Sequence, residues 1–468
     1  MKKLGAYLLT AALLALLLGA CGQPVMEAAQ EPGAPAPAAA SAPEATPEIT
    51  PEPPVDLGGT AVEADAETLE LREGAYDWDS LLAAAERLTR VKAIDFGETA
   101  LSAGQMTALR EAFPGAEIRC RLSLFGQELP LDTEALALPD MDPAQTDELA
   151  AALPLLPELK TLSFLREDGS CAYGLEDIPQ LDKLREAAPE AAFDVCFELF
   201  GQTVSSADER IEYLCVPIGN EGADTVRAVL PYLRSCSYLL MDGCGVDNEV
   251  MAQLREDFPE TKIVWRVWLV RPDYDSPRLL RTGSFLTDTH RIRTIVVDDS
   301  TCGVLKYCVE TKYVDFGHND YISDFSFLAY MPELEAAIIG LTHCHDLTPL
   351  ENCPKLEYLE CYGSDVTDLS PLQYCTNLKH LNCSRLKIND ITPIYGLDLE
   401  RLRCVVTDVP KEQLEEYAAL HPDCQMLLAG WAPHENGWRY DENGDMVPRY
   451  RLLREQMEYD LDREYGIL

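Results

Sequence analysis

The chain has 468 residues and is strongly acidic, with 80 Asp and Glu against 38 Lys and Arg and a formal net charge of −42 at pH 7. This charge repels phosphate backbones, so we expect no nucleic-acid partner. It also repels an anionic lipid surface, so membrane association needs a separate anchor. The length is sufficient for one large core or for two to three domains.

The first residues have the order of a cleaved signal peptide, which we assign to residues 1–20. Lys2 and Lys3 supply positive charge, and the apolar run over residues 6–18 is too short to span a bilayer. The run ends in Leu-Gly-Ala-Cys, which resembles the lipobox of bacterial lipoproteins. The resemblance implies a lipid such as palmitate on Cys21 and a location on the extracytoplasmic face of the cell membrane. An ordinary secretory signal that leaves a Cys is the alternative.

Residues 21–58 are expected to form a spacer after this lipidated Cys. Pro, Ala, Glu and Thr dominate the segment, and it has almost no large apolar side chain with which to offset the entropy of ordering. Its prolines favour extended conformations, which makes a semi-rigid linker. No later stretch reaches eighteen continuous apolar residues, so we predict no transmembrane helix.

Residues 59–300 contain a long, divergent repeat. Segments 109–114, 184–189 and 254–259 each begin with Leu-Arg-Glu and end in Pro, and they start 75 and 70 residues apart. Each is predicted to end an amphipathic helix that is followed by a strand. Leu-Phe-Gly-Gln also recurs after 75 residues, at Leu124 and Leu199. We expect α/β repeats here, with a separate N-terminal α/β domain as the alternative and residues 271–299 as the junction.

Residues 301–428 contain a shorter and more regular repeat. Asp324, Asp346, Asp368 and Asp390 stand 22 residues apart, and the prolines at 349, 371 and 393 keep the same interval. The pattern Leu-x-x-Leu-x-Cys precedes the turn at 356–361 and again at 378–383. A unit of this size buries its apolar face only by stacking on its neighbours.

This pattern resembles a leucine-rich repeat of the short, internalin-like class over roughly residues 312–428. The expected fold is therefore an α/β leucine-rich-repeat solenoid in which long divergent repeats are followed by short 22-residue repeats. The family usually places Asn on the turn after the strand, where the side chains form a hydrogen-bonded ladder. Thr342, Ser364 and Leu386 occupy these positions here, so we expect the ladder to be missing or degraded.

Residues 429–468 depart from the repeat. Four aromatic residues, Trp431, Trp438, Tyr440 and Tyr450, lie in a polar stretch, and residues 451–468 are predicted to form a charged helix. We interpret this region as a cap on the exposed end of the solenoid, because terminal repeats need a polar cover. Residues 437–440 resemble a single aromatic cell-wall-binding repeat, which is the alternative.

The chain contains sixteen Cys, and lipidation of Cys21 would leave an odd number. Several replace Leu at inward repeat positions; these are Cys353, Cys361, Cys375, Cys383 and Cys404. Free Cys packs as a small hydrophobe, so we expect them to fill the core. A disulfide between neighbouring coils is the alternative, and metal binding is least favoured because no Cys-x-x-Cys pair occurs.

No catalytic or cofactor motif emerges from the sequence. There is no Gly-x-Ser-x-Gly, no His-Glu-x-x-His and no phosphate-binding loop. The densest group of metal ligands is His343-Cys344-His345, for which we favour an exposed turn over zinc because no third ligand is identifiable. We therefore predict a protein that is not an enzyme and that binds no metal or cofactor.

The residues between the inward strand positions are predicted to project from the concave face of the solenoid. They are Tyr358, Glu360, Tyr362, His380, Asn382, Ser384, Arg401 and Arg403. Tyr and Arg are enriched at binding hot spots, so we predict that this face binds a protein or cell-envelope ligand. An ordinary solvated face is the alternative interpretation of the pattern.

The leading function is thus a membrane-anchored surface lipoprotein that acts as a binding module. A structural or envelope-assembly lipoprotein is one alternative. An enzyme with an unrecognised site in the long repeats is another, and a deep polar pocket between Asp56 and Asp299 would favour it.

Overall fold

The computed structural model describes residues 52–72, 74–276, 278–431 and 435–460. The signal peptide, Cys21 and most of the predicted linker lie outside these described residues. Within the described ranges, no helix is long and apolar enough to cross a membrane.

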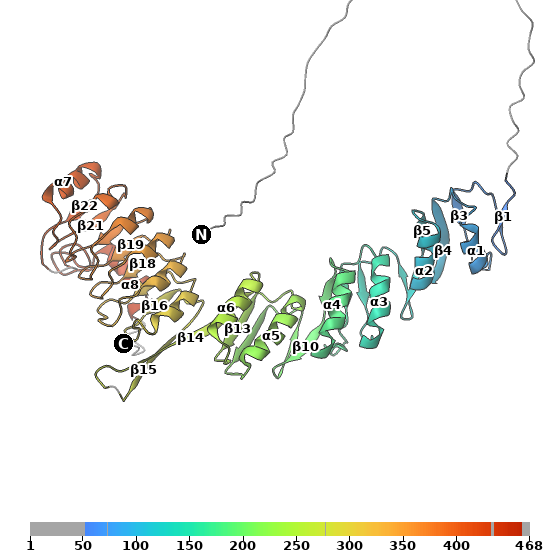
Figure 1. The fold of residues 1–468 in the computed structure, drawn as a ribbon, viewed down its shortest axis with the longest axis horizontal. Helices are drawn as coiled ribbons and strands as arrows, with labels where there is room; N and C mark the ends of the chain where they lie inside the picture. Colours follow the sequence, from blue (N-terminus) through green and yellow to red (C-terminus); the bar gives the residue numbers. More distant parts are fainter. Residues whose placement is uncertain (1–51, 73, 277, 432–434, 461–468) are drawn as a thin grey trace, which may run out of the picture. The chain divides into compact units, whose positions relative to one another are not determined.

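The first part of the described chain contains three α/β modules of one plan (Figure 1). Each has three parallel strands joined by two helices and then an antiparallel strand or hairpin. A small hairpin of β1 (Val55–Asp56) and β2 (Ala61–Val62) precedes them. The first module consists of β3 (Thr68–Glu70), α1 (Trp78–Ala84), β4 (Ala93–Ser102), α2 (Ala103–Ala112), β5 (Glu117–Leu124) and β6 (Gln127–Pro130).

The other two modules repeat this order. The second consists of β7 (Ala135–Ala137), α3 (Thr146–Ala152), β8 (Thr161–Ser163), α4 (Ile178–Ala187), β9 (Ala192–Asp194) and the hairpin β10 (Cys196–Leu199) and β11 (Gln202–Ser205). The third consists of β12 (Arg210–Leu214), α5 (Gly219–Val229), β13 (Tyr238–Asp242), α6 (Asn248–Asp257), β14 (Lys262–Pro272) and β15 (Leu280–Leu286). Short 3₁₀ turns η1 (Pro143–Gln145), η2 (Leu153–Leu155), η3 (Leu175–Asp177) and η4 (Leu230–Tyr232) flank some helices.

The predicted helix ends are confirmed at α2, α4 and α6. Each helix ends two residues before the Pro that the repeat supplies, because the residue preceding Pro disfavours the helical conformation. Both Leu-Phe-Gly-Gln segments form hairpin turns. Phe125 and Gly126, at φ 48° and 78°, occupy the left-handed region that a two-residue hairpin turn of this type requires.

The second part of the described chain forms one parallel sheet of seven strands in chain order. The strands are β16 (Arg291–Arg293), β17 (Tyr313–Asp315), β18 (Ala336–Ile338), β19 (Tyr358–Glu360), β20 (His380–Asn382), β21 (Arg401–Arg403) and β22 (Gln425–Leu427). The predicted period is kept in register, since Leu359 lies opposite Leu381. The sheet begins at Arg291, before residue 301, where the sequence placed the start of the short repeats.

Short helical turns return the chain from one strand of this sheet to the next. They are η5 (Cys302–Tyr307), η6 (Ser326–Tyr330), η7 (Thr348–Asn352), η8 (Ser370–Tyr374), η9 (Thr392–Ile394) and α7 (Lys411–Leu420). The repeated Asp starts such a turn: the carboxylate of Asp346 accepts the backbone N–H of Thr348 at 2.8 Å, and Asp368 and Asp390 do the same at 2.8 Å two residues on. The repeated Asp and Pro residues therefore belong to side-chain-capped 3₁₀ turns.

The expected degradation of the Asn ladder is confirmed at Thr342 and Ser364, whereas Asn319 one turn earlier does bridge two turns, since its Nδ2 donates to the carbonyl of Val297 at 2.8 Å. The hydroxyl of Thr342 donates to the carbonyl of Ile339 at 2.7 Å, and Ser364 donates to Cys361 at 2.7 Å. Each hydroxyl is satisfied within its own turn, whereas a ladder would bridge neighbouring turns.

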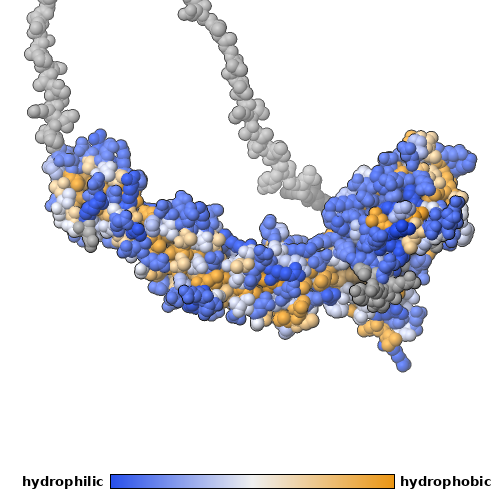
Figure 2. Space-filling model, turned by 180° about the vertical axis from the view of Figure 1, so that it is seen from behind, coloured by the Kyte–Doolittle hydropathy of each residue, from blue (hydrophilic) through white to orange (hydrophobic). Residues whose placement is uncertain are grey.

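One cluster of buried apolar side chains extends from Val55 to Cys424 through both parts of the described chain. The five Cys predicted to fill the core are all buried, at 4% exposure or less. The junction predicted at residues 271–299 includes the β14–β15 hairpin. Arg271 lies 4.9 Å from the ring centroids of both Tyr274 and Tyr321, which ties the hairpin to the first turns of the short repeats. Figure 2 shows that hydrophilic residues cover most of the face in view, with hydrophobic patches along the modules.

Candidate functional site

The strip of residues predicted to project into solvent is covered. We call the non-core side of strands β16–β22 the strand face. Tyr358, Glu360, Tyr362, Asn382 and Arg403 on or beside it are 1% exposed or less. His380 and Ser384 are also buried, and Arg401 is half-buried. The prediction that these residues face solvent is therefore wrong.

The reason is the C-terminal segment, residues 435–460, which packs on the strand face. Its helix α8 (Pro448–Gln456) begins three residues before the predicted helix. Side chains of the segment and of the strands form a second apolar cluster, distinct from the main core. Its members are Tyr313, Ala336, Ile338, Tyr358, Trp438, Tyr450, Leu453, Met457 and Tyr459. The prediction of a cap on the end of the solenoid is thus corrected, because this region covers the face of the sheet.

The carboxylate of Glu360 is the centre of this contact. The side chain of Glu360 has no exposed surface, and the indole Nε1 of Trp438 donates to its Oε1 at 2.9 Å. Arg439 donates through Nε to the same oxygen at 2.9 Å and through Nη2 to the other oxygen. The hydroxyl of Tyr358 on the same strand also donates to Glu360. Trp438, Arg439 and Tyr358 thus all converge on one buried carboxylate.

Electrostatics keep the guanidinium of Arg439 charged. Burial by itself lowers the pKa of Arg439, but the charge and hydrogen bonds of Glu360 raise this pKa well above its ordinary value. The pKa of Tyr358 is raised, first by burial and then by the charge of Glu360, so its hydroxyl remains a donor. Removal of either partner from a buried, doubly hydrogen-bonded ion pair of this kind costs folding free energy, because it leaves the other charge buried without a partner.

Aromatic rings extend the contact on both sides of Glu360. The ring centroids of Trp438 and Tyr358 lie 5.5 Å apart, and the guanidinium of Arg401 lies 5.2 Å from the Trp438 ring. Arg401 also donates through Nη2 to the carbonyl of Trp438 at 3.1 Å. The guanidinium of Arg449, on α8, lies 5.3 Å from the Tyr358 ring. Trp438 is therefore held between two residues of the strand face.

The end of the C-terminal segment contacts the first strands of the sheet. The hydroxyl of Tyr459 donates to Asp315 at 2.5 Å, and the guanidinium of Arg293 lies 4.0 Å from the Tyr459 ring. Glu458 accepts from Nε of Arg291 at 2.9 Å. The segment thus covers the face from β21 back to β16.

His380 is a buried strand-face residue whose protonation is shifted by its surroundings. Burial, together with the charges of Arg449, Arg401 and Lys379, lowers its pKa to about 3, so the imidazole is neutral at pH 7. Its Nδ1 has no hydrogen-bond partner among the described residues. Arg403 donates to the carbonyl of Ala429 at 3.4 Å.

The His343-Cys344-His345 group has the geometry of a turn. His343 is exposed and its Nδ1 lies 2.8 Å from the carboxylate of Asp365, whereas Cys344 points into the core. Over the described ranges, the structure brings together no group of three or more His, Cys, Asp and Glu that could hold a metal ion.

The sequence predicts the strand residues of this site but not the residues of the C-terminal segment that pack on them. Trp438 and Tyr450 stand out in the sequence as aromatic residues, but no pattern assigns them to the strand face or singles out Arg439 and Tyr459. The available signal was compositional: aromatic and basic residues follow the last repeat, and the predicted face carried Tyr and Glu.

The continuous parallel sheet and the 22-residue period define the fold as an α/β leucine-rich-repeat solenoid. Among solved structures it is similar to an internalin from Listeria monocytogenes, with 16% identity and a TM-score of 0.28 over 80% of this chain and 86% of the other. A leucine-rich-repeat protein of Leptospira interrogans is 14% identical, with a TM-score of 0.29 over 78% and 90%. The functional domain of InlJ from Listeria monocytogenes, which includes a cysteine ladder, is 10% identical, with a TM-score of 0.23 over 80% and 57%. No family model matches the chain, and no curated protein matches it.

Proposed function

We propose that the chain is a membrane-anchored surface lipoprotein whose leucine-rich-repeat module binds a protein partner through the strand face. The observation that carries the proposal is that Glu360 and Tyr358 already hold a peptide segment, through Trp438 and Arg439. The face therefore has the chemistry of a peptide site, and the C-terminal segment occupies it in this structure.

The contacts at Glu360 indicate what a partner would present. Trp and Arg are the residues most enriched at binding hot spots, and both donate here to one buried carboxylate. A partner segment with an aromatic donor beside an Arg would satisfy the same acceptors. The unsatisfied Nδ1 of His380 offers such a partner a further hydrogen bond that the C-terminal segment does not make.

A partner must compete with a segment of the same chain. A tethered segment acts at an effective concentration of the order of millimolar for a short flexible link, so weak partners are excluded. The strand face is then specific for partners that bind it more tightly than the C-terminal segment does.

The test uses the full chain with Trp438→Ala and Arg439→Ala together, which frees the acceptors of Glu360. A fluorescent peptide spanning residues 435–447 should bind this variant saturably and bind the unaltered protein at least about tenfold more weakly. Adding Glu360→Gln, which keeps the side-chain shape, should abolish binding. Equal binding with and without Glu360→Gln would exclude the proposed site, provided that far-ultraviolet circular dichroism is unchanged.

The anchor part of the proposal rests on Cys21 and its lipobox-like context. Acyl chains contribute about 0.8 kcal/mol per buried CH₂, and two chains suffice for stable anchoring. In a bacterial host, metabolic labelling with a palmitate analogue should mark the protein, and Cys21→Ser should lose both the label and the membrane fraction. Cys120→Ser is the matched control, since it leaves the lipobox intact. Label retained by Cys21→Ser would exclude lipidation at this residue.

A further inference from the structure

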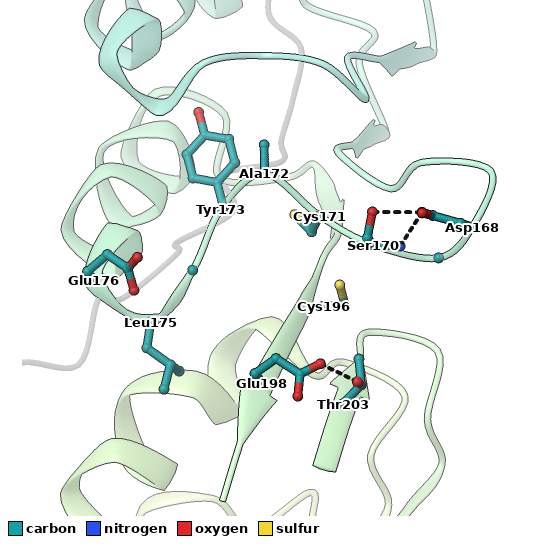
Figure 3. Close-up of a pocket in the computed structure, with 12 residues that line it drawn as sticks. Asp168, Ser170, Cys171, Ala172, Tyr173, Leu175, Glu176, Cys196, Glu198 and Thr203 are labelled. Atoms are coloured by element: carbon teal, nitrogen blue, oxygen red, sulfur yellow. Dashed lines mark hydrogen bonds between the residues drawn. The ribbon is translucent and has the colours of Figure 1, made fainter. Parts of the chain in front are cut away.

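A cavity in the second module lies outside the strand face. Its volume is about 540 Å³, and it is lined by the loop before α4 and by the hairpin β10–β11 (Figure 3). This is the kind of polar pocket between Asp56 and Asp299 for which the sequence analysis left room. Its lining contains carboxylates, hydroxyls and two thiols but no His, so the thiols are its nucleophilic groups.

The two thiols line the same cavity. Figure 3 shows the sulfur of Cys196 directed towards Cys171 across the cavity, and Cys171 is near enough for its charge to contribute to the raised pKa of Cys196. Cys171 is partly exposed and Cys196 is buried. One sulfur is therefore accessible from solvent, and the other lies behind it.

Both Cys are held by fixed backbone. Cys171 pairs with Leu165 across a turn in which the carboxylate of Asp168 accepts the N–H of Ser170 at 3.0 Å and its hydroxyl at 2.6 Å. Cys196 is the first residue of β10 and lies opposite Ser205 of β11. The two Cys therefore lie on two elements that are each held by their own hydrogen bonds, the turn before Cys171 and the β10–β11 hairpin.

We propose that Cys171 and Cys196 are a site of reversible disulfide formation, oxidised by exchange with a small cationic disulfide. The thiolate of Cys171 attacks one sulfur of the reagent, forms a mixed disulfide and releases one reagent thiolate. Cys196 then loses its proton to water and attacks the sulfur of Cys171, which releases the second thiolate. The two protein thiols lose two electrons, and the reagent disulfide gains them.

The order of attack follows from access and acidity. Burial raises the pKa of the Cys196 thiol to about 11, with a further contribution from the charge of Cys171, so Cys196 is a poor first nucleophile. Once Cys171 carries the mixed disulfide, the second attack is intramolecular and no longer depends on access from solvent.

The charge of the lining selects the reagent. Asp168, Glu176 and Glu198 line the cavity, and no Lys, Arg or His does. A dication such as cystamine is attracted to this rim, and oxidised glutathione, which is an anion, is repelled. Arg166 lies next to the cavity, but its guanidinium is paired with Asp140 at 3.2 Å.

A second pair of Cys is a built-in comparison. Cys383 and Cys404 on neighbouring strands share a side-chain hydrogen bond, but both are buried, at 0% and 4% exposure. No reagent reaches them in the folded protein, so no disulfide is expected between Cys383 and Cys404.

The experiment uses the full chain with Cys215→Ser, which removes an exposed thiol outside the cavity. After treatment with cystamine, the mass should fall by two hydrogens, and peptide mapping should find one disulfide joining Cys171 to Cys196. The initial rate should be higher with cystamine than with oxidised glutathione, and the ratio should shrink between about 0.01 M and about 1 M salt as the screening length falls from about 30 to about 3 Å.

Four variants make the result interpretable. Cys196→Ser should stop at a mixed disulfide on Cys171, Cys171→Ser should not react at the cavity, and Cys383→Ser should react like its parent. Glu176→Gln should lower the preference for cystamine. The proposal fails if both thiols remain alkylatable after prolonged treatment, if Cys196 never resolves the adduct, or if salt leaves the reagent preference unchanged. None of these outcomes depends on the strand face.

Discussion

The long modules and the short repeats stack parallel strands in different ways. Helices of seven to eleven residues join the parallel strands of the modules, and an antiparallel strand or hairpin follows each set of three. In the short repeats, 3₁₀ turns of three to six residues join most of the strands. The sheet of these repeats runs through seven strands without a break. In the modules, an antiparallel strand or hairpin therefore ends each set of three parallel strands. The short repeats have no such strand between β16 and β22, so their sheet and its face are continuous.

A continuous face has a consequence for polar residues. The strand face buries Glu360, His380, Asn382 and Arg403 under the C-terminal segment. Among the described residues, Arg271 in β14 is the one charged side chain that the parallel strands of the three modules bury, at 4% exposure. The two regions should therefore respond differently to loss of a charge, to acid and to added volume.

Loss of a buried charge should produce the largest difference. Glu360→Ala leaves Arg439 buried without its partner, which is expected to cost about 3–5 kcal/mol of unfolding free energy. Asp242→Ala removes an equally direct two-point partner from Arg266 in the third module, but those side chains are 17% and 27% exposed, so water can solvate the remaining charge. Urea unfolding followed by tryptophan fluorescence measures both losses. Equal losses would contradict the distinction between the two regions.

Mild acid should weaken the short repeats through His380. Its folded pKa is about 3, whereas an unfolded His titrates near about 6.5, so the unfolded chain binds more protons between these values. Stability is therefore complete above about pH 6.5 and falls as the pH falls, by at most about 1.4 kcal/mol per pH unit from this group.

The control for this effect is a variant without the titrating imidazole. His380→Gln should flatten the dependence of the urea midpoint between about pH 7 and about pH 5. The modules contain no His before His290, so a local probe there should show no matching change. An unchanged slope in His380→Gln would mean that another group is responsible.

The same substitution should have opposite signs in the two regions. Gly340→Ala would place a Cβ 2.8 Å from the buried ring of Tyr362, and overpacking of this kind costs about 1–3 kcal/mol. Gly104→Ala, in the first turn of α2, meets nothing within 4 Å and should stabilise by about 0.5 kcal/mol. Thermal unfolding of the two variants checks the signs, and a stabilising Gly340→Ala would show that the Tyr362 ring can move away.

The smallest difference is expected at the starts of helical turns. Asp346 caps η7 through Thr348, and Ser102 caps α2 in a reciprocal pair with Gln105. Asp346→Ala and Ser102→Ala should each cost about 1 kcal/mol. Denaturant midpoints measure both losses. If the two losses differ strongly, local capping, as well as sheet continuity, contributes differently to stability in the two regions.

The local features of both regions were predictable from sequence. The Pro after each Leu-Arg-Glu segment ended α2, α4 and α6, and the Asp repeat placed the 3₁₀ turns, because these signals act within a few residues. The inward Cys positions followed from the strand pattern for the same reason.

The covering of the strand face was not predictable in this way. Glu360 lies 78 and 79 residues from Trp438 and Arg439, and no period links them. Alternation along a strand says that Tyr358 and Glu360 leave the core, but it does not say what lies on the other side. The sequence therefore predicts the correct face for these residues but not their burial under the C-terminal segment.

The contacts of Tyr459 with Asp315 and of Glu458 with Arg291 join residues 144 and 167 positions apart. A chain that emerges from its N-terminus first can stack its strands as they appear, since each strand finds its neighbour locally. The strand face, however, stays open until residues 435–460 have been made. The newly made protein thus passes through a period in which its stacked repeats are complete and its polar and aromatic face is unshielded, when premature release or cleavage of the C-terminus would do the most harm.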